Sequence, residues 1–259
     1  MRNYIRTGLV WVMMLAPATA WATHPLRVVD TGTEGKGNYL FELTGDYRKD
    51  AELKTTKLTS IFTVGAGENT DFSVEAPYLK LDPSPVTDAF ASGKGDVRIK
   101  LKHRLFENEV KQSMAYQLYV DLPTGDADKG LGTNKVLWGI MLIDSQVCRS
   151  NAFHLNVGYE ALGGDLKQWH FARDYTVRFG LAAERKLSES FRVLAEFAGE
   201  SRKETDTGAD SSSYSRPFTF LVGVIYDISK SWYVDIGARA GLNKYADDYG
   251  ARVGTGWKF

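Results

Sequence analysis

Cysteine is almost missing from this 259-residue chain, because Cys148 is the single one, so no intramolecular disulfide can stabilise the fold. Histidine is also scarce, and the four histidines show no H-x-H, H-E-x-x-H or Cys/His spacing, so we predict no metal site. No apolar run approaches the ~18 residues that a membrane-spanning helix needs. Any insertion into a membrane must therefore use β-strands. Basic and acidic residues number 32 each, and this balance predicts no nucleic acid partner.

The first 22 residues have the pattern of a targeting segment. A basic start with Arg2 and Arg6 precedes an apolar run over residues 8–15 and an A-x-A sequence at residues 20–22. This pattern predicts a secretory signal peptide, 1–22, that is cleaved near Ala22. Its removal takes away two arginines and no acid, which leaves a net charge of −2. We expect an amino-terminal periplasmic or lumen segment at 23–38 and a β-barrel domain at 39–259.

Alternation of apolar and polar residues with a period of two runs from about Tyr39 to the end of the chain. It divides into twelve candidate strands, and no stretch has convincing helical periodicity. Residues 96–105 are the clearest case, because Val97, Ile99 and Leu101 share one face while Arg98 and Lys100 share the other. A soluble two-layer sandwich could show the same alternation, so further features must decide between the two folds.

Aromatic residues fall at the two ends of the apolar faces, with aliphatic residues between them. Such belts suit a lipid bilayer, because amphipathic rings favour the headgroup level. One belt contains Tyr47, Tyr78, Tyr159, Tyr175, Phe218 and Tyr249, and the other contains Phe72, Phe153, Phe191, Tyr226, Trp232, Trp257 and Phe259.

The connections between candidate strands alternate between short and long. Short ones lie near residues 65–69, 106–111, 148–151, 186–190 and 228–231, and long ones at 81–95, 123–134, 163–174 and 200–216. Short periplasmic turns and longer extracellular loops are typical of outer-membrane barrels. We therefore predict an all-β fold, a single closed antiparallel transmembrane β-barrel of about 12 strands, with both termini in the periplasm.

The last strand, residues 249–259, alternates large and small residues and ends in phenylalanine. The order of Arg252, Gly254, Trp257 and Phe259 resembles the carboxy-terminal signal of bacterial outer-membrane barrels. We take Gly254, Trp257 and Phe259 as an insertion signal. The expected destination is the outer membrane of a Gram-negative type cell, with its lipids and the barrel-assembly machinery as partners and a monomer as the final state.

Three further segments resemble the meta-pathway phenol-degradation family of outer-membrane proteins. They are residues 24–26 with 30–37, residues 93–97, and residues 122–126 with 130–132. Together with the last strand, the resemblance spans essentially the whole mature chain, although Val28-Val29 replaces polar residues that family members usually carry. It implies a transporter of small molecules associated with the breakdown of aromatic compounds.

The face opposite the apolar one should line the lumen and is rich in charge. Acids near residues 71–75 should face bases at 98–104, and Arg252 should lie beside Glu42 or Asp46 when the barrel closes. These charges could brace the lumen as ion pairs, or unpaired bases could bias passage toward anions such as aromatic carboxylates. The candidate lumen or selectivity residues are Asp71, Glu75, Arg98, Lys100, Lys102, Arg104, Arg178, Arg192, Glu196, Asp235, Arg239 and Arg252.

Other motifs carry little chemistry. The G-x-G runs lack a third glycine and a following helix, so they indicate turns and no cofactor site. No G-x-S-x-G is present, and no catalytic residue is predicted. Inward glycines in the second half of the chain could leave room for a solute or allow close approach of backbone. We expect a passive channel for small solutes, with aromatic compounds among the candidates. The alternatives are an outer-membrane lipid-modifying enzyme and a structural or adhesive barrel.

Overall fold

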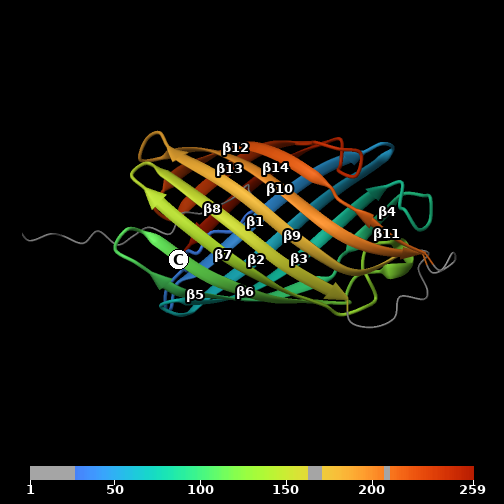
Figure 1. Ribbon diagram of the computed structural model, residues 1–259, viewed down its shortest axis with the longest axis horizontal. Coiled ribbons are helices and arrows are strands. Elements are labelled where there is room, and N and C mark those ends of the chain that lie inside the picture. Colours follow the sequence, from blue (N-terminus) through green and yellow to red (C-terminus); the bar gives the residue numbers. More distant parts are fainter. Residues whose placement is uncertain (1–26, 163–170, 207–210) are drawn as a thin grey trace, which may run out of the picture.

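The computed structural model describes residues 27–162, 171–206 and 211–259, so the predicted signal peptide and its cleavage site lie outside the described residues. These described residues form fourteen strands and one short 3-10 helix (Figure 1). The bounds are β1 (Tyr39–Asp50), β2 (Leu53–Gly67), β3 (Thr70–Asp82), β4 (Ala91–Lys94), β5 (Val97–Glu107), β6 (Gln112–Leu122), η1 (Ala127–Lys129), β7 (Leu137–Cys148), β8 (Asn151–Leu162), β9 (Phe171–Lys186), β10 (Phe191–Asp206), β11 (Ser211–Ser215), β12 (Phe218–Ser229), β13 (Trp232–Gly241) and β14 (Tyr249–Lys258).

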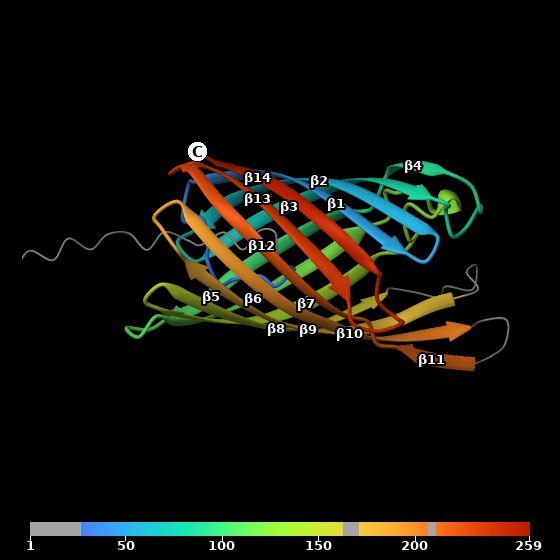
Figure 2. The same cartoon turned by 90° about the horizontal axis from the view of Figure 1, so that it is seen from above.

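Twelve of these strands form one closed antiparallel ring. Each strand pairs with its neighbours in the chain, β1 pairs with β14, and β9 pairs with β10 to complete the circle. The two remaining strands, β4 and β11, extend the wall by pairing with β3 and β10. Both lie at the end of the barrel opposite the carboxy terminus (Figure 2). The predicted twelve-stranded barrel is therefore confirmed.

Side-chain alternation assigns the two surfaces of the wall as the sequence predicts. Apolar residues such as Leu58, Leu155 and Val222 are exposed on the outside, at 46%, 43% and 49% of their surface. Their exposure matches a band that faces lipid, since an apolar outer face is what the hydrocarbon requires. Polar residues at the alternate positions point inward and are mostly buried.

Three connections differ from expectation, and the first is 81–95, where β4 forms within the expected loop and pairs with β3. Residues 163–174 and 200–216 were expected to form long loops, but β9 already begins at Phe171 and β10 continues to Asp206, where β11 pairs with it. The physical reason is continued antiparallel pairing of β9 with β10 from Glu200 to Asp206. This stretch has polar residues on both faces, so the alternation of apolar and polar residues that predicts a strand is missing there.

The carboxy terminus closes the ring beside the first strand. The backbone N–H of Tyr39 donates to the carbonyl of Phe259 at 2.8 Å, and the N–H of Phe259 donates to Tyr39 at 3.0 Å. The rings of these two residues stack with 5.7 Å between centroids. Within the described residues, no helix is long and apolar enough to span a membrane.

Candidate functional site: the charged lumen

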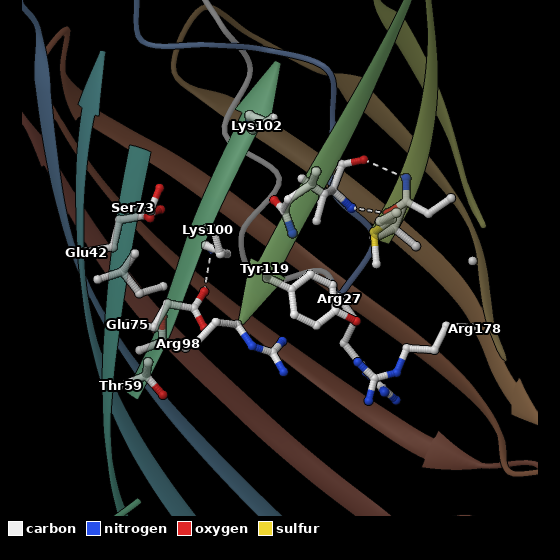
Figure 3. Close-up of a pocket in the computed structure, with 18 of the residues that line it drawn as sticks. Arg27, Glu42, Thr59, Ser73, Glu75, Arg98, Lys100, Lys102, Tyr119 and Arg178 are labelled. Atoms are coloured by element: carbon white, nitrogen blue, oxygen red, sulfur yellow. Dashed lines mark hydrogen bonds and ion pairs between the residues drawn. The ribbon is translucent and has the colours of Figure 1, made fainter. Parts of the chain in front are cut away.

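A cavity of about 540 Å³ lies inside the barrel, and charged side chains dominate its wall (Figure 3). Eleven basic and nine acidic residues line it, a small positive excess. The basic residues are Arg27, Arg48, Lys57, Arg98, Lys100, Lys102, Arg178, Arg202, Arg239, Arg252 and Lys258, and the acidic ones are Asp30, Glu34, Glu42, Asp46, Asp71, Glu75, Asp96, Asp121 and Glu200.

Eight of the twelve candidates from the sequence line this cavity: Asp71, Glu75, Arg98, Lys100, Lys102, Arg178, Arg239 and Arg252. The other four do not. Arg104 instead bonds Asn69 at 2.8 Å near the short turn between β2 and β3. Arg192, Glu196 and Asp235 are buried inward residues that make contacts within the wall or with the amino-terminal segment.

The acids of β3 and the bases of β5 lie opposite each other as expected. The register places Glu75 beside Arg98 and Asp71 beside Lys102. Glu75 also has a diagonal partner on β5, because the Lys100 ammonium, two positions along the strand from Arg98, donates to it. The Arg98 guanidinium makes a bidentate contact with the Asp121 carboxylate on β6, with nitrogen–oxygen distances of 2.5 and 2.8 Å. Bidentate pairs of this kind are among the stronger ion pairs in proteins.

Residues 27–37, which we name the lumen segment, run inside the barrel before β1 begins. Its extended backbone is held by side chains from the inner wall. Glu196 accepts the N–H groups of Arg27 and Val28 at 2.5 and 2.7 Å. Asn156 both accepts the N–H of Val29 and donates to its carbonyl, at 2.7 and 2.8 Å. These hydrogen bonds hold residues 27–29 against the inner wall of the barrel.

The far end of the lumen segment is fixed on β3 and β5. Asp71 accepts the backbone N–H of Glu34 at 3.0 Å, and Lys102 lies 3.6 Å from Asp30. Asp71 and Lys102 are direct neighbours in the register, but each contacts the segment with its charged end. The segment therefore takes up charges that would otherwise pair across the two strands.

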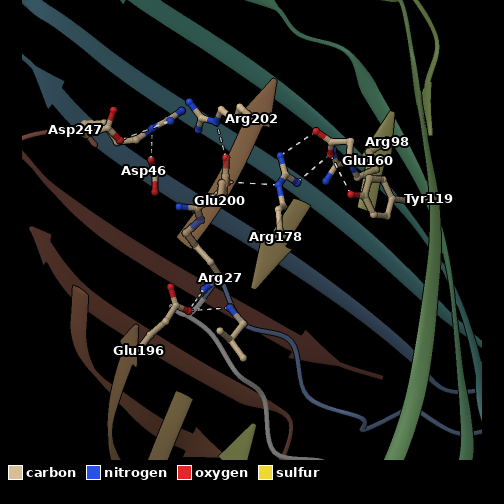
Figure 4. Close-up of polar contacts among 12 residues, drawn as sticks. Arg27, Asp46, Arg98, Tyr119, Glu160, Arg178, Glu196, Glu200, Arg202 and Asp247 are labelled. Carbon is tan, nitrogen blue, oxygen red and sulfur yellow. Dashed lines mark hydrogen bonds and ion pairs between the residues drawn. The ribbon is translucent and has the colours of Figure 1, made fainter. Parts of the chain in front are cut away.

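Glu200 is the centre of a cluster of guanidinium groups (Figure 4). Its carboxylate lies 2.5 Å from Arg27, 2.7 Å from Arg202 and 3.4 Å from Arg178. Burial lowers the pKa of Arg27, but the carboxylates of Glu200 and Glu196 raise it by more, so its pKa lies above the ordinary value. Glu196 and Glu160 also contact Arg27 and Arg178, so carboxylates offset much of the positive charge of this cluster.

A second carboxylate, Glu160, links this cluster to β5. Arg178 contacts Glu160 at 2.9 Å, and Arg98 lies 3.6 Å from it. The Tyr119 hydroxyl donates to Glu160 at 3.0 Å, while the Arg98 guanidinium lies over the Tyr119 ring at 4.3 Å. Figure 4 shows these groups facing one another from β5, β6, β8 and β9. Their mutual contacts fix the side chains that narrow the lumen.

Arg252 lies directly opposite Asp46 in the register of β14 with β1, one of the two positions expected for it. Asp46 itself binds Arg239 at 2.8 Å and lies 3.1 Å from Arg48. Lys57 faces the same cavity, and within the described residues it makes no ion pair closer than 4.0 Å. It is therefore a lumen cation whose charge is not compensated by direct contact.

Three of the inward glycines make room for neighbouring side chains. A Cβ at Gly256 would overlap the ring of Tyr233, and one at Gly254 would overlap the carboxylate of Asp235. A Cβ at Gly180 would lie only 2.4 Å from Val28 of the lumen segment. The alternative of close approach thus accounts for these three positions.

One serine contact escaped the sequence patterns. Ser145 on β7 pairs with His154 on β8, and its hydroxyl lies 2.8 Å from the His154 Nδ1 atom. The Nε2 atom of His154 lies 3.6 Å from Glu184. All three are buried, and the backbone N–H of Thr31 donates to the Ser145 hydroxyl at 3.2 Å. The lumen segment therefore covers this serine, which lies far from any lipid surface because its strand parity points inward.

The remaining acidic and histidine groups offer no evident ion site. Among the residues that the structure describes, no three His, Cys, Asp or Glu side chains gather so as to hold a metal. Asp126 in the loop after β6 bonds Lys129 at 2.7 Å. This hydrogen bond lowers the pKa of Asp126.

Sequence reasoning missed Glu160, Glu200 and Arg202 as parts of the site, and it left the amino-terminal segment between a periplasmic and a lumen position. Glu200 and Arg202 continue the inward parity of Glu196, and that continuation is the signal that could have found them. The contacts of residues 27–29 with Asn156, Glu196 and Glu200 join residues 127 to 173 positions apart, for which a single sequence contains no local signal.

Comparisons with known proteins agree with this architecture. A family model described as "Putative MetA-pathway of phenol degradation" matches residues 29–259. Among solved structures, the COG4313 outer membrane channel from Pseudomonas putida F1 is similar at 13% identity with a TM-score of 0.73, covering 89% of this chain and all of that one. The NanC porin has 13% identity and a TM-score of 0.56, covering 85% and 100%. The KdgM porin in complex with disordered oligogalacturonate has 11% identity and a TM-score of 0.54, covering 85% and 99%. No curated protein matches the sequence.

Proposed function

The chain belongs to this family associated with phenol degradation, and from that membership and its porin-like outer-membrane barrel we propose a passive channel for small solutes that favours anions. The observation that carries the proposal is the cavity wall, with its excess of basic over acidic side chains. Rings of one sign of charge in a narrow pore attract ions of the opposite sign and repel others.

The unpaired cation Lys57 is the residue that we expect to contribute most to this preference. Arg98 and Lys100 have carboxylate partners within the wall, which offset much of their field. Lys57 has no such contact among the described residues, so its field extends into the cavity. A charge without a partner in a confined, partly desolvated space acts on a passing ion more strongly than a paired one.

We propose small aromatic carboxylates as the solute class. The family description supports the aromatic part, and the cationic wall supports a carboxylate. A cavity of about 540 Å³ has the size of ordinary small-molecule sites in proteins. The similar KdgM porin carries an acidic sugar polymer in its solved complex, which is a precedent for carboxylate solutes within this architecture.

We do not propose a hydrolase on the strength of Ser145 and His154. A serine nucleophile needs access to substrate and donors that stabilise the developing oxyanion. Ser145 is 3% exposed, and the donor that the structure places beside it, the N–H of Thr31, is bonded to the hydroxyl itself. The contact is better explained as buried polar packing that helps to fix the lumen segment.

The test is the reversal potential of purified, reconstituted protein in planar bilayers of neutral phosphatidylcholine under a KCl gradient near 1 M. We expect discrete current steps and a reversal potential displaced toward chloride. Lys57→Glu should move it toward potassium. Lys54→Glu is the matched control, because Lys54 lies on the same strand but on the outer face, and at ~1 M salt its field is screened within ~3 Å.

Benzoate then replaces chloride on one side of the membrane. Measurable benzoate current supports the proposed solute class. If chloride passes and benzoate does not, the aromatic part of the proposal is wrong while the channel stands. The channel itself would be refuted by membranes that stay closed under every gradient.

A further inference from the structure

Four lysines gather on the outer face of the barrel at the end that carries β4. They are Lys49 on β1, Lys54 on β2, Lys80 on β3 and Lys94 on β4, and we name them the outer lysine patch. Strand pairing places them together, since Lys49 lies opposite Lys54 and the strands β1 to β4 are neighbours in the sheet. Figures 1 and 2 show these strand ends side by side at the end opposite the carboxy terminus.

Register fixes the direction in which these side chains point. Lys94 lies opposite Tyr78, and Lys80 follows Tyr78 by two positions, so both share the outward face of that exposed tyrosine. Lys49 likewise follows Tyr47 by two positions. Two residues along a strand span about 7 Å, so Lys49 and Lys80 lie one step beyond the aromatic belt. Lys54 lies level with Lys49, and Lys94 lies level with the belt itself. That step corresponds to the headgroup level of the outer leaflet.

The positive charge of the outer lysine patch is not neutralised by close ion pairs. None of the four lysines makes an ion pair within 4.0 Å in the part of the chain that the structure describes. Lys49 and Lys80 lie over the rings of Tyr249 and Phe90, at 5.9 and 5.2 Å, which leaves their ammonium groups without an anion.

Two acids adjoin the patch: Asp82 lies opposite Lys54 in the register, and the exposed Glu52 precedes Lys54 by two positions. Like charges directly opposite each other in a sheet destabilise it, and Lys49 and Lys54 form such a pair. An external anion at this level would relieve that repulsion.

We propose that the outer lysine patch binds the phosphate groups of a phosphorylated glycolipid in the outer leaflet of the outer membrane. The charge, the position beyond the aromatic belt and the outward direction fit a lipid headgroup. They do not fit a solute in the lumen, because the wall separates the patch from the cavity. A phosphate carries close to two negative charges and several acceptor oxygens, so two phosphates can occupy four ammonium groups. Binding there would fix the depth of the barrel in the membrane on the side of β1 to β4.

The experiment uses the full mature protein in detergent and native mass spectrometry with diphosphoryl lipid A as the probe. We expect one or two lipid molecules to stay bound to the wild type. The variant K49Q/K54Q/K80Q should bind at least tenfold more weakly, since a basic residue near an anionic lipid surface contributes about fivefold in affinity. The control K36Q/K230Q/K244Q removes the same charge from exposed lysines outside the patch and should bind like the wild type.

A second comparison depends on no variant. Wild-type protein should retain diphosphoryl lipid A better than monophosphoryl lipid A, and both better than phosphatidylglycerol. Equal retention of phosphatidylglycerol would overturn the glycolipid assignment, because any anionic headgroup would then suffice. Equal loss of binding in the patch variant and the control would overturn the site. A heat-modifiability gel establishes that each variant is folded before it is measured.

Discussion

Single inward side chains hold the lumen segment by bonding to its backbone. Glu196 and Asn156 together satisfy three N–H groups and one carbonyl of residues 27–29. A buried hydrogen bond contributes about 1 kcal/mol net, and leaving a buried partner unsatisfied costs about 1–3 kcal/mol. These two residues therefore decide how firmly the segment stays in place.

Replacing Asn156 with leucine should loosen the lumen segment. Leucine is similar in size but can neither accept from nor donate to Val29, so both contacts are lost. We expect more frequent current fluctuations and a larger mean single-channel conductance. Asn151→Leu is the control, because Asn151 begins the same strand at a turn and has no contact with the segment in the described structure. Identical traces for both variants would contradict a holding role for Asn156.

Glycines on β14 depend on large partners across the strand pair. Gly256→Val should destabilise the barrel by about 1–3 kcal/mol, because the added carbons must displace the buried ring of Tyr233. Gly67→Ala should be neutral by comparison, since its Cβ would meet Thr70 at 3.7 Å, an ordinary contact. Urea unfolding followed by gel mobility measures both, and a neutral Gly256→Val would show that the wall adjusts freely.

For the strands, the sequence predicts most clearly which side chains face outward and which face inward. The alternation in β5 and β14 correctly assigned lipid and lumen faces, because a period of two survives wherever one face must be apolar. The same alternation did not predict β10 beyond Gly199. Both faces of the strand are polar there, so the sequence shows no difference between an apolar and a polar face. Element type was thus predictable within the apolar band, and strand ends outside it were not.

We predict that the terminal strand acts as a signal in the assembly of the barrel. Phe259→Ala should lower the yield of inserted barrel in cells, since it removes the terminal ring of the proposed insertion signal and its stacking on Tyr39. Folding in detergent should change little, because the backbone pairing of β1 with β14 is kept. Tyr249→Ala, at the other end of the same strand, is the control. An equal loss in cells for both variants would count against a specific signal.

For the molecule as a whole, the lumen is set by contacts between distant parts of the chain. Closure of twelve strands follows from the pattern, but the filling of the barrel by residues 27–37 does not, because its partners lie on β3, β6, β7, β8 and β10. The sequence therefore supplied most of the wall and eight of the cavity residues. It supplied little of the cavity's shape.

Deleting residues 23–34 should widen the path through the barrel. The described part of this deletion, residues 27–34, takes up space inside the lumen and contributes to the cavity wall from Arg27 to Glu34. We expect the unit conductance to rise by several-fold and the anion preference to fall as the pore widens. Thermal stability should drop modestly, because buried acceptors such as Glu196 lose their partners. A conductance that does not change would mean that ions bypass the region the segment occupies.

The central claim is that solutes cross the membrane through the cavity inside this barrel. Cysteine blockade tests it most directly, with Lys57→Cys in a Cys148→Ser background and a bulky charged methanethiosulfonate reagent added during single-channel recording. Leu58→Cys, the next residue on β2, faces outward and serves as the control. We expect current through Lys57→Cys to fall in one irreversible step and current through Leu58→Cys to persist. Modification of residue 57 that leaves the current intact would contradict passage through the cavity.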